Sequence, residues 1–270
     1  GIKPLYYFYN DDGLFFSSEI KPLKNLVGKE FSIDYAVCFD YLAYSNYDLG
    51  EKTFYNDVYR VKPGYYIEHD IINMNSSEVK WWRPSLYENT SLCYADAVSE
   101  FKSLFLTSIK RQIRSDVNIG AALSGGLDSS SIVCAIKHIE PDFDLKTFTF
   151  DSQENKTSEI GWVNCVLQAT NFNNTVKSFN FKNASNQISE LINIQGEPIA
   201  STSMLANRLI YQMASESDVK VVLEGQGADE ILAGYRGYPL SQILSAISLN
   251  RWDRVLSYLK NWSSLPGNSV

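Results

Sequence analysis

A regular alternation of short apolar runs and helical segments, which begins near Tyr94, constrains the fold of this chain more than any other feature. Four runs have the length and apolar character of buried strands: 117–123, 145–150, 175–181 and 220–223. Segments with helical spacing lie between these strands, two of them between the third strand and the last: 130–139, 159–169, 184–194 and 203–215. Because strands that are joined through helices pair in parallel and are covered on both faces, we predict an α/β fold built on a parallel sheet.

The residues before this region are predicted to be β-rich. Asp11-Asp12-Gly13 lies between two aromatic-rich runs, and Asp-Gly at such a place indicates a hairpin. Ser32 is expected to cap a helix that ends near Tyr44. We therefore expect three parts along the chain: a first domain over 1–83, a linker over 84–93 and a second domain over 94–270.

The segment Ser124-Gly-Gly-Leu-Asp-Ser-Ser130, called the phosphate loop below, joins a predicted strand to a helix and suits a bound phosphate. Its two glycines let backbone N–H groups turn toward an anion, the positive end of the next helix points at the same place, and serine hydroxyls add donors. Asp128 has the wrong charge to bind phosphate directly, so we assign it a Mg²⁺ that bridges carboxylate and phosphate oxygens. A Walker A loop is excluded because no lysine follows the glycines. The alternative is a plain Gly-Gly turn in which Asp128 caps the helix.

A second loop, residues 223–230, follows the last predicted strand and reads Leu-Glu-Gly-Gln-Gly-Ala-Asp-Glu. Its glycines allow a ligand to approach closely, and Asp229 and Glu230 open a helical stretch. Both loops leave the carboxyl ends of parallel strands, where open α/β sheets bind ligands. Asp128 and Asp229 are therefore expected to flank one metal ion. The alternative for Asp229 is a favourable charge at a helix start.

The net charge of −7 and a pI near 5.0 disfavour nucleic-acid binding through a basic face. No apolar run approaches the ~20 residues of a membrane helix. The four cysteines lack zinc-ligand spacing, and three lie among apolar residues, which predicts buried thiols in a reducing, cytoplasmic protein. The chain begins at Gly1 in a strand-like pattern, so we expect an internal fragment.

The phosphate loop, followed about a hundred residues later by Gly225-Gln-Gly-Ala-Asp-Glu-Ile-Leu-Ala-Gly-Tyr235, resembles the glutamine-hydrolysing asparagine synthetase family. The front end agrees, because residues 1–7, 18–21 and 61–64 resemble the last third of that family's glutaminase domain. The resemblance implies a parallel sheet of the ATP-pyrophosphatase type, similar to adenine nucleotide alpha hydrolases. Part of a β-rich, Ntn-type glutaminase domain would precede it. ATP and aspartate would give β-aspartyl-AMP and pyrophosphate, and ammonia from glutamine would then form the amide.

The resemblance also implies roles for individual residues. Asp128 and Asp229 would hold Mg²⁺ and, with Glu159 near the reaction centre, form the catalytic set. The whole phosphate loop would bind the pyrophosphate part of ATP: Ser124, Gly125, Gly126, Leu127, Asp128, Ser129 and Ser130. Four further residues would contact the adenosine: Leu123, Phe150, Glu224 and Gly225.

The sequence departs from the family in three respects. Gln226 stands where well-studied members carry glutamate, and a neutral amide cannot act as a general base, which puts the amino-acid pocket in doubt. The family's nucleophilic cysteine would precede Gly1, and its catalytic lysine would follow Val270, so we expect the 270-residue chain to lack glutaminase activity. Two alternatives stay open: a synthetase for another carboxylate, such as a β-lactam or macrocycle synthetase, and an inactive homologue that binds nucleotide. A homodimer is a further expectation.

Overall fold

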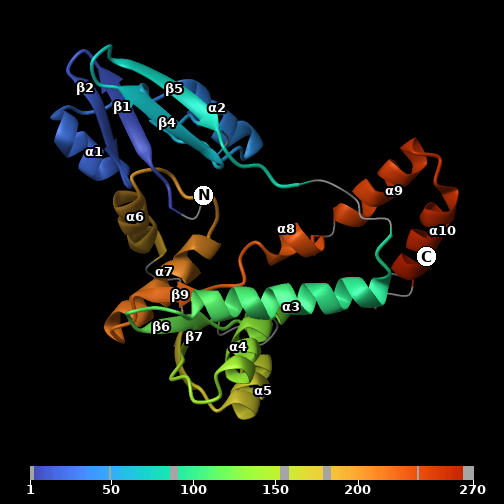
Figure 1. Ribbon diagram of the computed structural model, residues 1–270. Helices are drawn as coiled ribbons and strands as arrows, with labels where there is room; N and C mark the ends of the chain where they lie inside the picture. The colour runs from blue at the N-terminus through green and yellow to red at the C-terminus, as the bar shows by residue number, and fades with distance from the viewer. Residues whose placement is uncertain are drawn as a thin grey trace. The chain divides into compact units, whose positions relative to one another are not determined.

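The chain divides into two compact units in the computed structural model, which describes residues 3–48, 50–85, 91–152, 158–178, 184–235 and 237–263. The first unit contains residues 1–103 and 177–212, and the second contains residues 104–176 and 213–270 (Figure 1). The segment 177–212 therefore clusters with the N-terminal residues, although it follows the phosphate loop in the sequence. The units are described one at a time below.

The first unit is built on two small antiparallel sheets. One sheet has the strand order β2-β1-β3, and the other pairs β4 with β5. The strands have these bounds: β1 Tyr6–Asn10, β2 Gly13–Ser17, β3 Val58–Arg60, β4 Tyr65–Asp70 and β5 Asn75–Lys80. The register of β1 and β2 runs from Tyr6 opposite Ser17 to Asn10 opposite Gly13. The predicted hairpin is therefore confirmed.

Three helices complete most of the first unit: α1 (Ile20–Val27), α2 (Tyr35–Tyr44) and α6 (Ala184–Gln195). The core lies between β1, β3 and α1, where Phe8, Leu23, Phe31 and Val58 are buried. The prediction that Ser32 caps α2 is wrong. Asp34 is the cap, because its side chain accepts hydrogen bonds from the N–H groups of Ala36 and Val37.

The second unit is built around a four-stranded sheet with the order β8-β7-β6-β9. Its strands have these bounds: β6 Ile119–Ala122, β7 Lys146–Asp151, β8 Asn173–Ser178 and β9 Val221–Leu223. Strand β6 pairs in parallel with both β7 and β9. The predicted α/β class with a parallel sheet is confirmed. Residues 179–181, which the prediction included in β8, lie outside the described residues.

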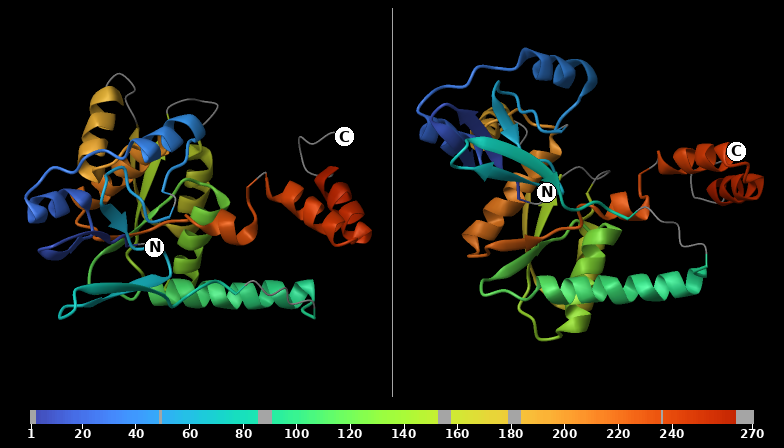
Figure 2. Two further views of the ribbon diagram at one scale, coloured as in Figure 1. Left: turned by 90° about the horizontal axis from the view of Figure 1, so that it is seen from above. Right: turned by 45° about the horizontal axis from the view of Figure 1, so that its top comes forward.

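Helices α4 (Leu127–Ile139) and α5 (Ile160–Thr170) supply much of the apolar cover of this sheet (Figure 1). The main buried residues come from β6, α4, α5 and the ends of β7 and β9: Ile119, Ala121, Leu123, Val133, Ile136, Leu145, Val163 and Leu223. Ile109 of α3 (Tyr94–Gln112) joins them. The remaining helices are α7 (Ser203–Glu216), α8 (Ala228–Leu232), α9 (Tyr238–Ser248) and α10 (Trp252–Ser263). Helices α9 and α10 contact each other as a hairpin (Figure 2).

The prediction of buried cysteines is wrong, and a helix of the second unit shows the physical reason. Trp162 of α5 is 68% exposed, whereas its neighbour Val163 is fully buried. The cysteines are not buried either, since Cys38 is half-buried and Cys93, Cys134 and Cys165 are exposed. Successive residues of a helix point about 100° apart, so an apolar neighbour in sequence does not bury the residue beside it.

No helix in the described part of the chain combines the length and the apolar character that crossing a membrane requires.

Candidate functional site

The phosphate loop connects the carboxyl end of β6 to α4, as predicted, but the helix begins earlier than expected. Gly126 is the N-cap residue in an extended conformation, and α4 starts at Leu127 instead of at 130. Gly125 has a φ of +85°, a conformation that favours glycine. Asp128 and Ser129 therefore lie in the first turn of α4, so the alternative in which Asp128 caps this helix is wrong. The free N–H groups of this turn are donors of the kind that bind anions at helix starts.

Serine hydroxyls hold the loop in shape. The Ser124 N–H donates to Ser129 Oγ over 3.2 Å, and the two hydroxyl oxygens lie 3.1 Å apart. The Gly126 N–H donates to Ser124 Oγ over 3.2 Å. Ser129 is buried, so its hydroxyl is used inside the loop. The Ser130 hydroxyl oxygen is also buried but has no hydrogen-bond partner among the described residues. It is therefore a donor that a ligand at the loop would satisfy.

Gly125 brings the phosphate loop against the start of α5. A Cβ atom placed on Gly125 would lie 2.8 Å from Trp162 Cβ and 3.1 Å from the Glu159 carbonyl oxygen. Glu159 is the N-cap residue of α5, and its side chain is exposed. The structure thus places the backbone of Glu159 beside the phosphate loop, although Glu159 lies 29 positions after Ser130 in the sequence.

Gly225 brings the second loop against the same helix start. A Cβ atom on Gly225 would lie 2.8 Å from Asp128 Cβ and 3.1 Å from the Ser129 nitrogen. The parallel pairing of β6 with β9 explains this approach, because both loops leave the same edge of the sheet. Phe150 and Glu224 are half-buried and stand at the carboxyl ends of β7 and β9. The candidate residues of both loops therefore meet at one edge.

Asp229 lies in the first turn of α8, which begins after Gly227. Gly227 has a φ of +92°. A side chain at Gly234 would overlap the Asp229 carboxylate, so the absence of a Cβ there makes room for it. Asp128 and Asp229 are both half-buried.

The donor set fits Mg²⁺ that is shared with a phosphate ligand. Among the described residues, no three His, Cys, Asp or Glu side chains converge as a metal cage would require. Mg²⁺ is usually held by one or two carboxylates together with substrate phosphates and water. The two loops supply such carboxylates, because Asp128 lies at the start of α4 and Asp229 lies in the second loop.

Two residues that the sequence analysis did not single out contribute to this geometry. Thr149 is buried in β7, and its hydroxyl donates to the Leu123 carbonyl over 2.7 Å, which anchors the end of β6. Alternation within residues 146–151 did not indicate its burial, because this strand of a parallel sheet is buried on both faces. Gly234 leaves room for Asp229, and no local pattern indicates that role.

Two family profiles match the chain. The profile described as Asparagine synthase matches residues 100–269, and the profile described as Glutamine amidotransferase domain matches residues 1–82. The first match includes the phosphate loop, Glu159 and the second loop.

Individual relatives agree with these profiles. Asparagine synthetase [glutamine-hydrolyzing] 1 of Bacillus subtilis is 29% identical over 96% of this chain and 39% of its own length. A putative asparagine synthetase [glutamine-hydrolyzing] 2 of Methanocaldococcus jannaschii is 26% identical over 87% of this chain and 45% of its own length. Among solved structures, the NH3-dependent NAD synthetase of Campylobacter jejuni matches 51% of this chain and 60% of its own, with 15% identity and a TM-score of 0.36. The chain spans less than half the length of these two curated relatives. Because the first profile covers more than half of the sequence, the chain belongs to the asparagine synthase family.

Proposed function

We propose that the full-length protein is an ATP-dependent amide ligase that converts aspartate to β-aspartyl-AMP and then to asparagine with ammonia from glutamine. The observation that carries this proposal is the junction of the phosphate loop, the start of α5 and the second loop at one edge of a parallel sheet. The family membership and the names of the relatives support it. We further propose that residues 1–83 belong to a glutaminase domain and residues 94–270 to the synthetase domain.

The chain's own residues would bind and orient the triphosphate. The N–H groups at the start of α4 and the unpartnered Ser130 hydroxyl would donate to phosphate oxygens. Leu123, Phe150, Glu224 and Gly225 would border the adenosine. Because these donors are held in place before ATP arrives, they would stabilise the charge that develops on the leaving pyrophosphate.

Asp128 and Asp229 would hold the metal ion. Mg²⁺ bound there would neutralise charge on the β- and γ-phosphates as pyrophosphate leaves. The exposed side chain of Glu159 starts from a backbone that touches the phosphate loop, which supports a place for it near the reacting carboxylate.

A second candidate keeps the ATP chemistry but changes the acceptor. Gln226 is exposed in the second loop, and its neutral amide cannot take the role of a general base. This observation favours a carboxylate other than aspartate, as in β-lactam or macrocycle synthetases. A nucleotide-binding homologue without turnover is less well supported, because Ser124, Asp128 and Asp229 are all present.

ATP–pyrophosphate exchange by the purified full-length protein tests these proposals. We expect exchange that requires both aspartate and Mg²⁺ and that stops on chelation. Glutamate and a reaction without any carboxylate are the matched controls. Exchange that depends on a different carboxylate would show that this carboxylate, and not aspartate, is the substrate. Mg²⁺-dependent ATP binding without exchange, for any carboxylate tried, would instead identify an inactive homologue.

A further inference from the structure

Within the first unit, residues 195–199 lie against the N-terminal part of the chain through a set of polar contacts. The Tyr55 hydroxyl donates to the Gly196 carbonyl over 2.7 Å, and the Tyr41 hydroxyl donates to the Ile199 carbonyl over 2.8 Å. The Gln195 side chain also donates to the Tyr47 hydroxyl. Residues 195–199 fall in the part that the asparagine synthase profile matches, whereas the three tyrosines fall in the part that the glutamine amidotransferase profile matches. These contacts therefore join the two family segments.

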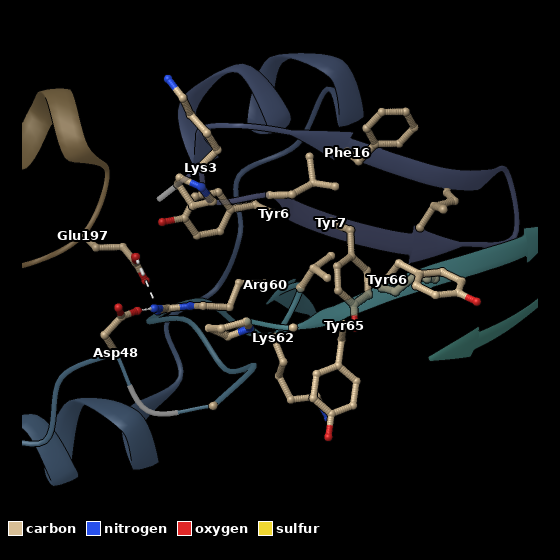
Figure 3. A pocket seen from close by; sticks show the side chains of 18 of the residues that line it. Lys3, Tyr6, Tyr7, Phe16, Asp48, Arg60, Lys62, Tyr65, Tyr66 and Glu197 are labelled. Atoms are coloured by element: carbon tan, nitrogen blue, oxygen red, sulfur yellow. Dashed lines mark ion pairs between the residues drawn. The ribbon is translucent and has the colours of Figure 1, made fainter. Parts of the chain in front are cut away.

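Glu197 is the buried centre of these contacts. Its side chain is 2% exposed, and its Oε1 accepts a hydrogen bond from the Phe54 N–H over 3.0 Å. Its Oε2 lies 3.7 Å from Nη2 of Arg60, which is 11% exposed and also pairs with Asp48 (Figure 3). A carboxylate this deeply buried is tolerated only when it is partnered. Arg60 and Phe54 supply those partners from the N-terminal part of the chain.

Tyrosine side chains lie near Glu197 and keep their hydroxyl protons. Arg60 and Glu197 line a cavity of about 960 Å³, together with tyrosine side chains that include Tyr6 and Tyr47. Burial, with the nearby Glu197 charge, raises the pKa of Tyr6 and raises the pKa of Tyr47 to about 12. Both hydroxyls therefore remain protonated. A buried polar network such as this has directional partners, so it specifies one arrangement of the two segments more sharply than apolar packing does.

The position of Glu197 in the chain connects this network to the candidate site. After Glu197 the chain continues through α7 and β9 into the second loop, which contains Gly225 and Asp229. If the proposed function holds, glutamine hydrolysis and amide formation belong to different family segments and share ammonia, which is small and diffuses readily. A contact that holds residues 195–199 on the glutaminase-like segment is then expected to influence how much of the ammonia is used in amide formation.

We infer that Arg60 and Glu197 are a pair of positioning residues that couple glutamine hydrolysis to amide synthesis. The inference rests on the proposed function. The pair touches no reacting atom; it holds residues 195–199 on the glutaminase-like segment. Loosening the pair should let ammonia escape while each half-reaction continues.

The test uses the full-length protein with Arg60→Gln, Glu197→Gln and the double variant. Glu197→Gln keeps an oxygen that can accept from Phe54 and removes the charge. The matched control is Lys62→Gln, because Lys62 pairs with Glu51 and Glu78 inside the N-terminal part itself. Three rates are compared: glutamine hydrolysis, amide synthesis from added ammonia, and amide synthesis from glutamine.

We expect each single variant to raise the glutamate released per amide formed by about fivefold or more, the lower range of couplings between two sites. The two half-reactions should stay within about twofold of wild type. The double variant should be no worse than the worse single variant, because it leaves no buried charge unpaired; Asp48, the other partner of Arg60, is exposed. Lys62→Gln should leave the ratio unchanged. A parallel fall in all three rates would identify a merely structural pair, and an unchanged ratio in both single variants would also overturn the inference.

Hydrogen exchange separates this inference from the proposed function. If the wild type makes no amide from added ammonia, the proposed function fails, and the pairing is then judged from the Phe54 amide, which donates to Glu197. Arg60→Gln should make this amide exchange faster, because Glu197 loses its charged partner, whereas Lys62→Gln should not. Equal protection of Phe54 in wild type and Arg60→Gln would overturn the pairing whatever the activity.

Discussion

Gly225→Ala in the full-length protein probes the contact between the phosphate loop and the second loop. The new Cβ would lie 2.8 Å from Asp128 Cβ, 3.1 Å from the Ser129 nitrogen and 3.3 Å from the Asp128 carbonyl carbon. Favourable separations of such atoms are about 3.5–4.0 Å, so the two loops must separate by roughly 1 Å. None of the three atoms can rotate away, because all belong to the backbone or are bonded directly to it.

The expected cost has two parts. Overpacking of this kind destabilises a protein by about 1–3 kcal/mol, which lowers the thermal midpoint. Displacing catalytic groups by about 1 Å costs on the order of 10²-fold in rate, so kcat/KM for ATP should fall by about that factor. If the only effect were obstruction of adenosine, as the family resemblance implies, the ATP KM would rise while the stability of the ligand-free protein stayed the same.

ATP–pyrophosphate exchange and thermal unfolding without ligand measure the two parts separately. Gly237→Ala is the matched control. Apart from its chain neighbours and its own helix backbone, no heavy atom of the described residues lies within 4 Å of the added Cβ, and its φ of −75° suits alanine. The reasoning is refuted if Gly225→Ala matches Gly237→Ala in both midpoint and kcat/KM.

Three further predictions follow from the same structure. Asp128→Asn should lower exchange by about 10²–10³-fold with little loss of stability, since a single preorganised charge contributes that much at a reaction centre; exchange within a few-fold of wild type would end the metal assignment. Gly120→Ala should destabilise the second unit by about 1–3 kcal/mol in thermal unfolding, because its Cβ would lie 2.6 Å from a ring carbon of Phe148 and 2.9 Å from the Lys146 carbonyl; an unchanged midpoint would contradict the tight packing of β6. Burial raises the pKa of Glu197 above its ordinary value of about 4.3, so the folded protein holds this proton more tightly and loses stability as the pH rises through the folded-state pKa. Glu197→Gln removes that loss, so the thermal midpoint of this variant relative to that of the wild type should increase as the pH rises above the ordinary glutamate pKa. A difference that stays constant with pH would show that burial does not raise this pKa.

Local patterns in the sequence located the strands of the second unit and its helices α4 and α5. The apolar runs that became β6, β7 and β9 are short and bounded by turns, and the parallel sheet followed because helices separate them. The same reasoning located both loops at one edge of the sheet. It failed at the start of α4, where the extended conformation of Gly126 begins the helix at Leu127. It also failed for the cysteines, because burial depends on the direction of a side chain and not on its neighbours in sequence.

Contacts between distant segments were decided by the tertiary structure alone. No local pattern indicates that Gly125 lies against the start of α5, that Gly225 lies against Asp128, or that Gly234 leaves room for Asp229. The burial of Glu197 beside Arg60, 137 residues earlier, is of the same kind. Periodicity and turn chemistry act over a few residues, so they specify elements. Which residues of different elements meet depends on how the whole chain packs, and that packing sets both the close approach of the two loops and the partner of a buried charge.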